Sequence, residues 1–111
     1  MSGQYPKRGD IWWVALDPTI GSEIKKTRPC VVLSINEVNQ YRRTVLVIPL
    51  SSSVKENPPV TIAVTCQGKP CIAIVDQLRA VSKERLQGFI EKMNPKEFEN
   101  IIKSLLTVIE A

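Results

Sequence analysis

The chain has 111 residues, the length of one domain with a single hydrophobic core, and 43% of them are apolar, which excludes a wholly disordered chain. Fifteen Lys and Arg against eleven Asp and Glu give a net charge of +4, which is compatible with a polyanionic partner. The sequence has no histidine, so it excludes a Ser-His-Asp triad, a two-histidine ribonuclease mechanism and an HExxH metal site.

Membrane and secreted proteins are also not expected from this sequence. No apolar run approaches the length that crosses a membrane, and the polar start of the chain does not resemble a signal peptide. The three cysteines, Cys30, Cys66 and Cys71, form no CxxC pair, so we expect reduced thiols and no zinc site. We therefore expect a cytoplasmic protein that uses no cofactor.

The first clear element is a strand over residues 11–16. A turn at Arg8-Gly9-Asp10 precedes it, and its Ile, Val and two tryptophans favour a β-strand. Trp12 and Trp13 are adjacent and must point to opposite faces, so we expect one in the core and the other on a second surface. A long polar loop over residues 17–27 follows, and loops of this length are usually functional or mobile.

Two apolar runs after this loop predict two more strands. The first runs from about Pro29 to Ile35, and Pro29, which lacks an N–H, suits the first position of a strand. A polar connection over residues 36–43 leads to the second run, residues 44–50. This run is apolar throughout and predicts a central strand that is covered on both faces.

The remaining chain predicts a hairpin, a further strand and a helix. In order, we expect a polar loop at 51–59, strands at 60–64 and 71–75 joined by a turn at 67–70, a short turn within 76–82 and a strand at 86–91.

The terminal helix has the strongest local signals. Asn94 suits the N-cap, Pro95 suits the first helical position, and Glu97 completes an Asn-x-x-Glu capping pattern. Six apolar residues recur at helical spacing and should pack on the sheet: Phe98, Ile101, Ile102, Leu105, Leu106 and Ile109. The elements together predict one mainly β domain over residues 1–111, a small curved antiparallel sheet or open SH3-like barrel with a C-terminal helix.

A candidate site lies where two of these strands meet. Pro29 pushes Arg28 towards an extended backbone, which places a guanidinium at the rim of the sheet. If the second and third strands form an antiparallel hairpin, the start of one lies beside the end of the other, and Arg28 lies next to Ser51. A guanidinium and a hydroxyl at one sheet edge, with Lys25 and Lys26 nearby, predict a phosphate site.

Less specific interpretations of the same residues stay open. Arg28 could form a surface ion pair with Glu23, and Ser51 could be a turn residue at the head of a serine-rich loop. Asp76 ends a further strand, but the sequence does not indicate which face of the sheet it shares.

The order and spacing of five motifs resemble the MazF/PemK family of toxins over nearly the whole chain. These motifs are Arg8-Gly9-Asp10-Ile11, Pro18-x-x-Gly21-Ser22-Glu23, Lys26-x-Arg28-Pro29-x-Val31-Val32-Leu33-Ser34, Val47-Ile48-Pro49-Leu50-Ser51-Ser52 and Asp76-Gln77-Leu78-Arg79. The resemblance implies a barrel-like fold, a homodimer, and metal-independent endoribonuclease activity on single-stranded RNA at short sequences. It also implies a cognate MazE-like antitoxin whose flexible acidic tail occupies the RNA groove.

The resemblance also implies roles for individual residues. The family's catalytic Arg and Thr or Ser correspond to Arg28 and Ser51, and Glu23 and Asp76 match supporting positions, either of which could be the general base. Some relatives place a second catalytic Arg two residues before that Asp, where this chain has Ile74. The residues expected to contact RNA are Lys25, Lys26, Thr27, Ser52, Lys55, Gln77 and Arg79.

The chemistry requires few protein groups because RNA carries its own nucleophile. The 2′-OH attacks the adjacent phosphorus, and the charge that develops on the non-bridging oxygens suits a guanidinium and a hydroxyl donor. The expected products are a 2′,3′-cyclic phosphate and a 5′-OH. Two other classes stay open, a generic RNA-binding barrel without catalysis and a CcdB-like gyrase poison. The chain ends Thr107-Val108-Ile109-Glu110-Ala111 without the Trp expected of the second class.

Overall fold

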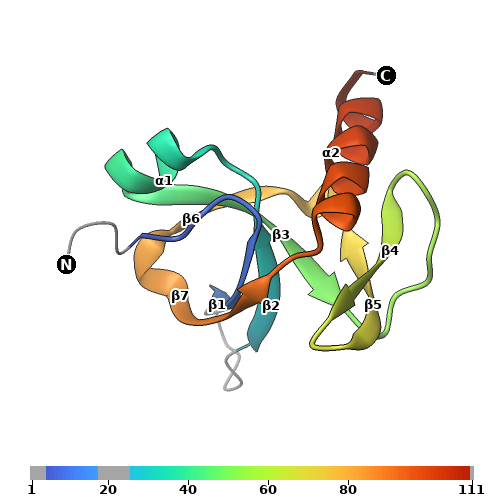
Figure 1. Cartoon of the computed structure of the whole chain (residues 1–111), viewed down its shortest axis with the longest axis horizontal. Helices are drawn as coiled ribbons and strands as arrows, with labels where there is room; N and C mark the ends of the chain where they lie inside the picture. Colours follow the sequence, from blue (N-terminus) through green and yellow to red (C-terminus); the bar gives the residue numbers. More distant parts are fainter. Residues whose placement is uncertain (1–4, 18–25, 111) are drawn as a thin grey trace.

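The computed structural model describes residues 5–17 and 26–110 and shows a curved antiparallel sheet with one long helix against it (Figure 1). In chain order the elements are β1 (Asp10–Asp17), β2 (Lys26–Val32), α1 (Asn36–Tyr41), β3 (Thr44–Ser51), β4 (Thr61–Cys66), β5 (Lys69–Ile74), the 3₁₀ turn η1 (Val75–Gln77), β6 (Arg79–Ser82), the 3₁₀ turn η2 (Lys83–Arg85), β7 (Leu86–Lys92) and α2 (Pro95–Glu110). The expected mainly β fold with a C-terminal helix is confirmed. No helix among these residues is long and apolar enough to cross a membrane.

Strand β3 is central, as its continuous apolar run predicted. The strand order is β4-β5-β3-β2-β1-β7, and β6 also pairs with β3. The first half of β3 pairs with β6, from Thr44 to Val47, whereas Leu50 and Ser51 pair with β5. The strand therefore joins a barrel-like half, made with β1, β2, β6 and β7, to the β4–β5 hairpin.

Two hydrophobic clusters cover the two faces of the sheet. In β2, Cys30 and Val32 point into a cluster with residues of β1, β3 and β6, whereas Val31 points into a cluster with β4, β5 and α2. This alternation follows the period of two along a strand. Trp12 packs on the first cluster and makes an edge-to-face contact with Phe89, at 5.9 Å between ring centroids. Its neighbour Trp13 is 37% exposed, so the expectation of opposite faces holds although neither ring is fully buried.

Strand β2 starts earlier than the apolar pattern predicted. The sequence placed Arg28 at the end of a loop, but the strand begins at Lys26, and Arg28 lies inside it opposite Val14 of β1. It also ends at Val32, three residues before the predicted end at Ile35. Pairing with β1 extends the strand over polar residues that carry no apolar signal of their own. The 17–27 loop is therefore shorter than expected, and its residues 18–25 lie outside the described part of the chain.

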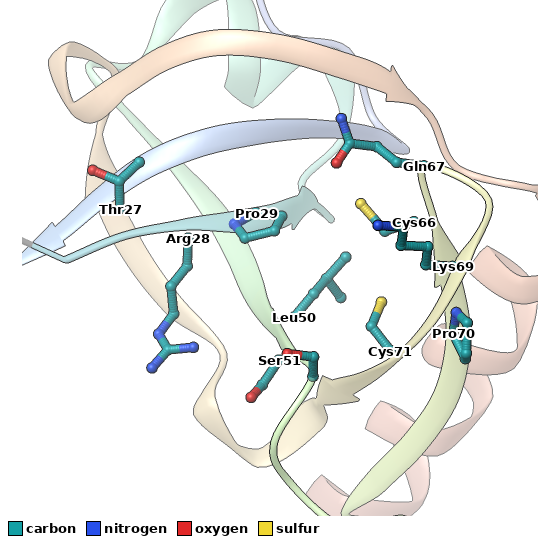
Figure 2. A pocket seen from close by; sticks show the side chains of 11 residues that line it. Thr27, Arg28, Pro29, Leu50, Ser51, Cys66, Gln67, Lys69, Pro70 and Cys71 are labelled. Atoms are coloured by element: carbon teal, nitrogen blue, oxygen red, sulfur yellow. The ribbon is translucent and has the colours of Figure 1, made fainter.

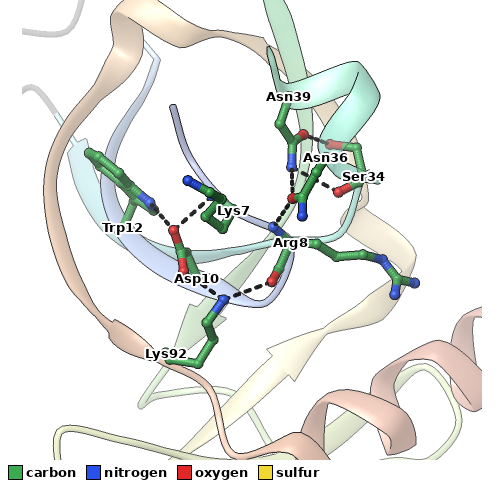
Figure 3. A network of polar contacts seen from close by, with 8 residues as sticks. All are labelled: Lys7, Arg8, Asp10, Trp12, Ser34, Asn36, Asn39 and Lys92. Carbon is green, nitrogen blue, oxygen red and sulfur yellow. Dashed lines mark hydrogen bonds and ion pairs between the residues drawn. The ribbon is translucent and has the colours of Figure 1, made fainter. Parts of the chain in front are cut away.

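Two short elements were also missed. Helix α1 occupies the predicted polar connection, and strand β6 occupies the second half of the predicted turn at 76–82. Helix α1 is held by a polar core, because the buried Asn39 donates to the carbonyl of Ser34 at 2.9 Å and also meets its hydroxyl (Figure 3). The Ser34 hydroxyl in turn accepts from the Leu46 N–H at 3.0 Å. Such long-range partners leave no periodic pattern in the sequence.

The Arg8-Gly9-Asp10 turn is a structural tie between the two ends of the domain (Figure 3). Gly9 has φ +90°, a conformation that L side chains rarely adopt. The carboxylate of Asp10 pairs with Lys92 of β7 at 3.1 Å and accepts from the indole N–H of Trp12 at 3.2 Å. Lys92 also donates to the carbonyl of Arg8 at 3.1 Å.

Helix α2 begins as predicted, with one difference in its cap. Asn94 accepts from the N–H groups of Lys96 at 2.8 Å and Glu97 at 3.2 Å, as an N-cap does. The Glu97 carboxylate, however, accepts from the N–H and hydroxyl of Thr65, at 2.9 and 3.0 Å. It therefore ties the helix to β4, because the sheet offers it two donors. Figure 1 shows α2 beside the β4–β5 hairpin, away from α1.

Candidate active site

A cavity of about 270 Å³ lies between the start of β2, the end of β3 and the β4–β5 hairpin (Figure 2). It is lined by Thr27, Arg28 and Pro29 of β2, by Leu50, Ser51 and Ser52 at the end of β3, and by Cys66, Gln67, Lys69, Pro70 and Cys71 of the hairpin. Four of the residues predicted from the sequence therefore share one cavity: Thr27, Arg28, Ser51 and Ser52.

The register of β2 and β3 places the two predicted catalytic side chains opposite each other. Cys30 pairs with Pro49 and Val31 with Ile48, so continuing the same register by two residues brings Arg28 opposite Ser51. Figure 2 shows both side chains extending from neighbouring strands towards the same side of the sheet. The predicted antiparallel pairing of these two strands is confirmed, and Arg28 and Ser51 line the same cavity.

The guanidinium of Arg28 has no partner among the described residues. The residue is half-buried, and its side chain makes no hydrogen bond or ion pair with any other residue in the described ranges 5–17 and 26–110. The proposed pairing with Glu23 falls outside those ranges. Since Arg28 lies within a paired strand, its backbone is fixed, and a flat five-donor fork stands at the cavity rim.

Ser51 is buried, with 5% of its surface exposed, and it is held by the turn that follows β3. Its hydroxyl oxygen accepts from the N–H of Ser53 at 3.2 Å and lies 3.2 Å from the Ser53 hydroxyl. The oxygen is thus used as an acceptor, whereas the hydroxyl proton can rotate towards a ligand oxygen. Ser51 therefore has a structural role in the turn as well as a place in the cavity.

A second arginine, Arg79, affects the buried thiol of Cys30. Burial raises the pKa of the Cys30 thiol to about 12, and the positive charges of Arg79 and Arg28 oppose this rise. Arg79 pairs with Val47 of β3, whose side chain lies in the same cluster as Cys30. Arg79 therefore adds a positive charge that acts on Cys30 from β6, but it does not line the cavity.

Among the described residues, the other predicted site residues do not line the cavity. Lys55 is exposed in the loop after β3, and Asp76 and Gln77 are exposed in η1. The main chain of Lys26 starts β2, but its side chain lies outside the described part of the chain, as do Glu23 and Lys25. The prediction of Asp76 as a supporting residue thus has no support from a shared cavity.

The wall formed by the β4–β5 hairpin was missed by sequence reasoning. The sequence predicted the hairpin itself but not its place beside the site, because the pairing of Ser51 with Ile72 is a long-range contact without a local signal. Cys66 and Cys71 are free thiols in this wall, and burial raises the pKa of both, that of Cys71 to about 11. No group of three or more His, Cys, Asp or Glu that could hold a metal ion occurs among the described residues.

Comparison with known proteins identifies the family. The family model described as a PemK-like, MazF-like toxin of type II toxin–antitoxin systems matches residues 7–109. The chain belongs to this family. It is 32% identical to the toxin MazF, an endoribonuclease of Escherichia coli K12, over 98% of this chain and 97% of that protein. It is also 32% identical to the endoribonuclease MazF9 of Mycobacterium tuberculosis, over 89% of this chain and 92% of that protein.

Solved structures agree on the fold. The MazE–MazF structure of Deinococcus radiodurans matches with a TM-score of 0.82 at 20% identity, covering 95% of this chain and 96% of that one. The family resemblance inferred from the five motifs is confirmed.

Proposed function

We propose that this family member is a sequence-specific endoribonuclease toxin that cleaves single-stranded RNA in the cytoplasm without a metal ion, using Arg28 and Ser51. The observation that carries the proposal is the juxtaposition, in one cavity, of a hydroxyl and a guanidinium that has no partner among the described residues, on two paired strands. The endoribonuclease activity named for the MazF relatives supports the reaction class.

The arrangement suits a reaction in which the RNA attacks itself. The 2′-oxygen forms a bond to the adjacent phosphorus while the bond to the 5′-oxygen of the next nucleotide breaks. Arg28 would hold two non-bridging oxygens through its fork, and the Ser51 hydroxyl would donate to the same group. Since both groups stand on paired strands, they need little reorganisation as charge develops. The products are a 2′,3′-cyclic phosphate and a 5′-OH.

The two proton transfers need other groups. A guanidinium keeps its proton at neutral pH, so Arg28 acts by charge and position. Glu23 and Asp76 are the candidate bases. Asp76 is exposed on η1 and does not line the cavity, so it could take the 2′-proton only if the bound RNA extends across η1.

RNA binding would extend beyond the cavity. Arg79 adds a cation on the barrel side, and Thr27 and Ser52 add hydroxyls within the cavity. We also propose contacts from Lys25, Lys26, Lys55 and Gln77 to nucleotides farther from the cut. Phosphate contacts of this kind weaken binding as salt rises. For single strands, the logarithm of the binding constant falls with the logarithm of the salt concentration by a slope of about 0.7 per contact.

The partners we propose are a second copy of the chain and a MazE-like antitoxin. The solved neighbours include a MazE–MazF complex. Several large apolar side chains are exposed on the single chain and would gain from burial in a dimer, among them Phe89 at 55% and Ile109 at 66%. An acidic antitoxin tail would suit the cations at Arg28 and Arg79.

The direct test is incubation of a long RNA with the purified protein in EDTA. Discrete fragments are expected, since the proposed reaction needs no metal. Binding of the RNA without cleavage would instead favour a non-catalytic RNA-binding barrel. Loss of DNA gyrase activity in the presence of the protein, with the RNA intact, would favour a CcdB-like poison.

A further inference from the structure

We propose that the β4–β5 hairpin forms a nucleobase-binding subsite beside the Arg28–Ser51 pair, and that Gln67 is the residue that reads the base. The proposal rests on the proposed function, because it assigns the subsite to an RNA whose phosphate is held at Arg28.

The cavity divides into a polar end and an apolar middle. Arg28, Ser51 and Thr27 lie at one end, whereas Pro29, Leu50, Cys66, Pro70 and Cys71 supply most of the remaining lining. Burial raises the pKa of both hairpin thiols, so they stay neutral at pH 7 and act as small apolar groups. Apolar walls of this kind do not stabilise a phosphate group, but they stabilise a flat base that lies against them. The volume of about 270 Å³ is just below the usual range of small-molecule sites, which suits a single base.

Gln67 occupies a position that its local backbone does not favour. Gln67 has φ +56° and Gly68 has φ +75°, so both residues of this two-residue turn adopt the left-handed conformation. Asn, Asp and Gly are the residues that such turns prefer. Glutamine in this conformation is uncommon, and sparsely populated backbone conformations cluster at ligand-binding positions.

The hairpin is held firmly while the Gln67 carboxamide remains available. The N–H of Gln67 donates to Glu91 of β7 at 2.7 Å, and Thr65 is bound by Glu97 of α2. The carboxamide has no hydrogen-bond partner in the described part of the chain. Figure 2 shows Gln67 and Lys69 extending from the hairpin back towards β2, across the cavity from Arg28. A rigid support and an unpaired polar head are what base recognition needs.

The chemistry of the carboxamide defines the base class. Gln presents a donor and an acceptor side by side, which pair with the amino group and N7 on the edge of adenine. Single-stranded RNA is read in this way when a base is unstacked and its edge is hydrogen-bonded. We therefore expect an adenine at one position next to the cleaved phosphate, held between the apolar walls with its edge on Gln67.

The test compares cut-site preferences of wild type, Gln67→Ala and Gln67→Glu on an RNA pool randomised around the cleaved position. Gln67→Ala should lose discrimination at one neighbouring position by about 5- to 150-fold, the range for one bidentate base contact. Gln67→Glu should shift that position towards guanine, because a carboxylate only accepts and unpaired guanine offers two adjacent donors, its N1–H and its N2 amino group. Gln87→Ala, exposed on β7 and outside the cavity, is the matched control and should leave the preferences unchanged.

A parallel binding measurement separates this proposal from the proposed function. A 2′-O-methyl RNA cannot be cut, so its affinity for each variant reports base reading alone, and thermal unfolding confirms that each variant is folded. Wild type that binds with a one-position preference lost in Gln67→Ala, yet cuts no RNA, would overturn the cleavage proposal and support the subsite. Unchanged preferences of Gln67→Ala in both cutting and binding would overturn the subsite.

Discussion

Replacing Arg28 by Ala separates catalysis from folding more sharply than other changes in this chain. The side chain is half-buried and makes no hydrogen bond or ion pair with the other described residues, while its backbone stays paired with β1. Truncation therefore removes no member of the two hydrophobic clusters and leaves no buried partner unpaired among the described residues. We expect the free energy of unfolding to change by about 0.5 kcal/mol or less, which corresponds to roughly 2–4 °C in Tm.

The loss of activity should be far larger than the loss of stability. Removing one donor from a site that stabilises a developing anion lowers the rate about 100- to 1,000-fold. Arg28→Lys keeps the charge but loses the fork, so it should recover only part of this loss. Arg43→Ala removes the same charge from an exposed position outside the cavity and should cut nearly as fast as wild type.

The assay is single-turnover cleavage of a fluorogenic RNA at saturating enzyme, with Tm measured on the same samples. Saturation matters because Arg28 also contributes to binding. Cleavage by Arg28→Ala within a few-fold of wild type would refute the role of Arg28. An equal loss in Arg43→Ala would show that net charge, and not the position of the guanidinium, decides the rate.

Three further predictions concern other parts of the structure. Ser51→Thr should keep the activity and Ser51→Ala should lose about 100-fold in single-turnover cleavage, because the hydroxyl donates to the phosphate. Asn39→Ala should lower the free energy of unfolding by about 1–3 kcal/mol in urea, with the cleavage rate of the folded protein unchanged, because it leaves the buried Ser34 groups unsatisfied. Burial raises the pKa of Cys30 to about 12 and of Cys71 to about 11 from 9.0, so the folded state holds these protons more tightly. Their contribution to stability is full below pH 9 and is lost as the pH rises towards 12, which urea unfolding at pH 8 and pH 10 can measure.

Each of these has a result that would count against it. If the two Ser51 variants were equally active, the role of Ser51 would be only structural, to accept the Ser53 N–H and close the turn. An Asn39→Ala protein as stable as wild type would mean that water satisfies the Ser34 groups. If the stability of a Cys30→Ala variant fell between pH 8 and pH 10 as steeply as that of wild type, the fall would come from groups other than Cys30.

Local patterns predicted those elements whose residues carry a periodic signal. Strands β3 and β7, the β4–β5 hairpin and helix α2 were predicted to within a few residues, because apolar runs, turn residues and an N-cap mark them. The juxtaposition of Arg28 and Ser51 also followed from sequence, since an antiparallel hairpin fixes which strand ends meet.

Long-range contacts account for what the sequence did not predict. The first residues of β2 are polar and become a strand only because β1 supplies partners for them. Helix α1 depends on the buried Asn39, whose partners lie in Ser34 and not in a periodic stripe. The hairpin wall of the cavity depends on the pairing of Ser51 with Ile72, and the position of Asp76 depends on η1. These contacts involve tertiary partners that no local window contains.

The central claim is that this chain cleaves RNA by attack of the 2′-OH, with Arg28 holding the phosphate. Mapping the ends of the fragments formed in EDTA tests it most directly. We predict 2′,3′-cyclic phosphate and 5′-OH ends from wild type, no such fragments from Arg28→Ala, and no cleavage when the nucleotide before the cut carries a 2′-deoxyribose. Fragments with 3′-OH and 5′-phosphate ends, or cleavage that survives the 2′-deoxy substitution, would contradict the account.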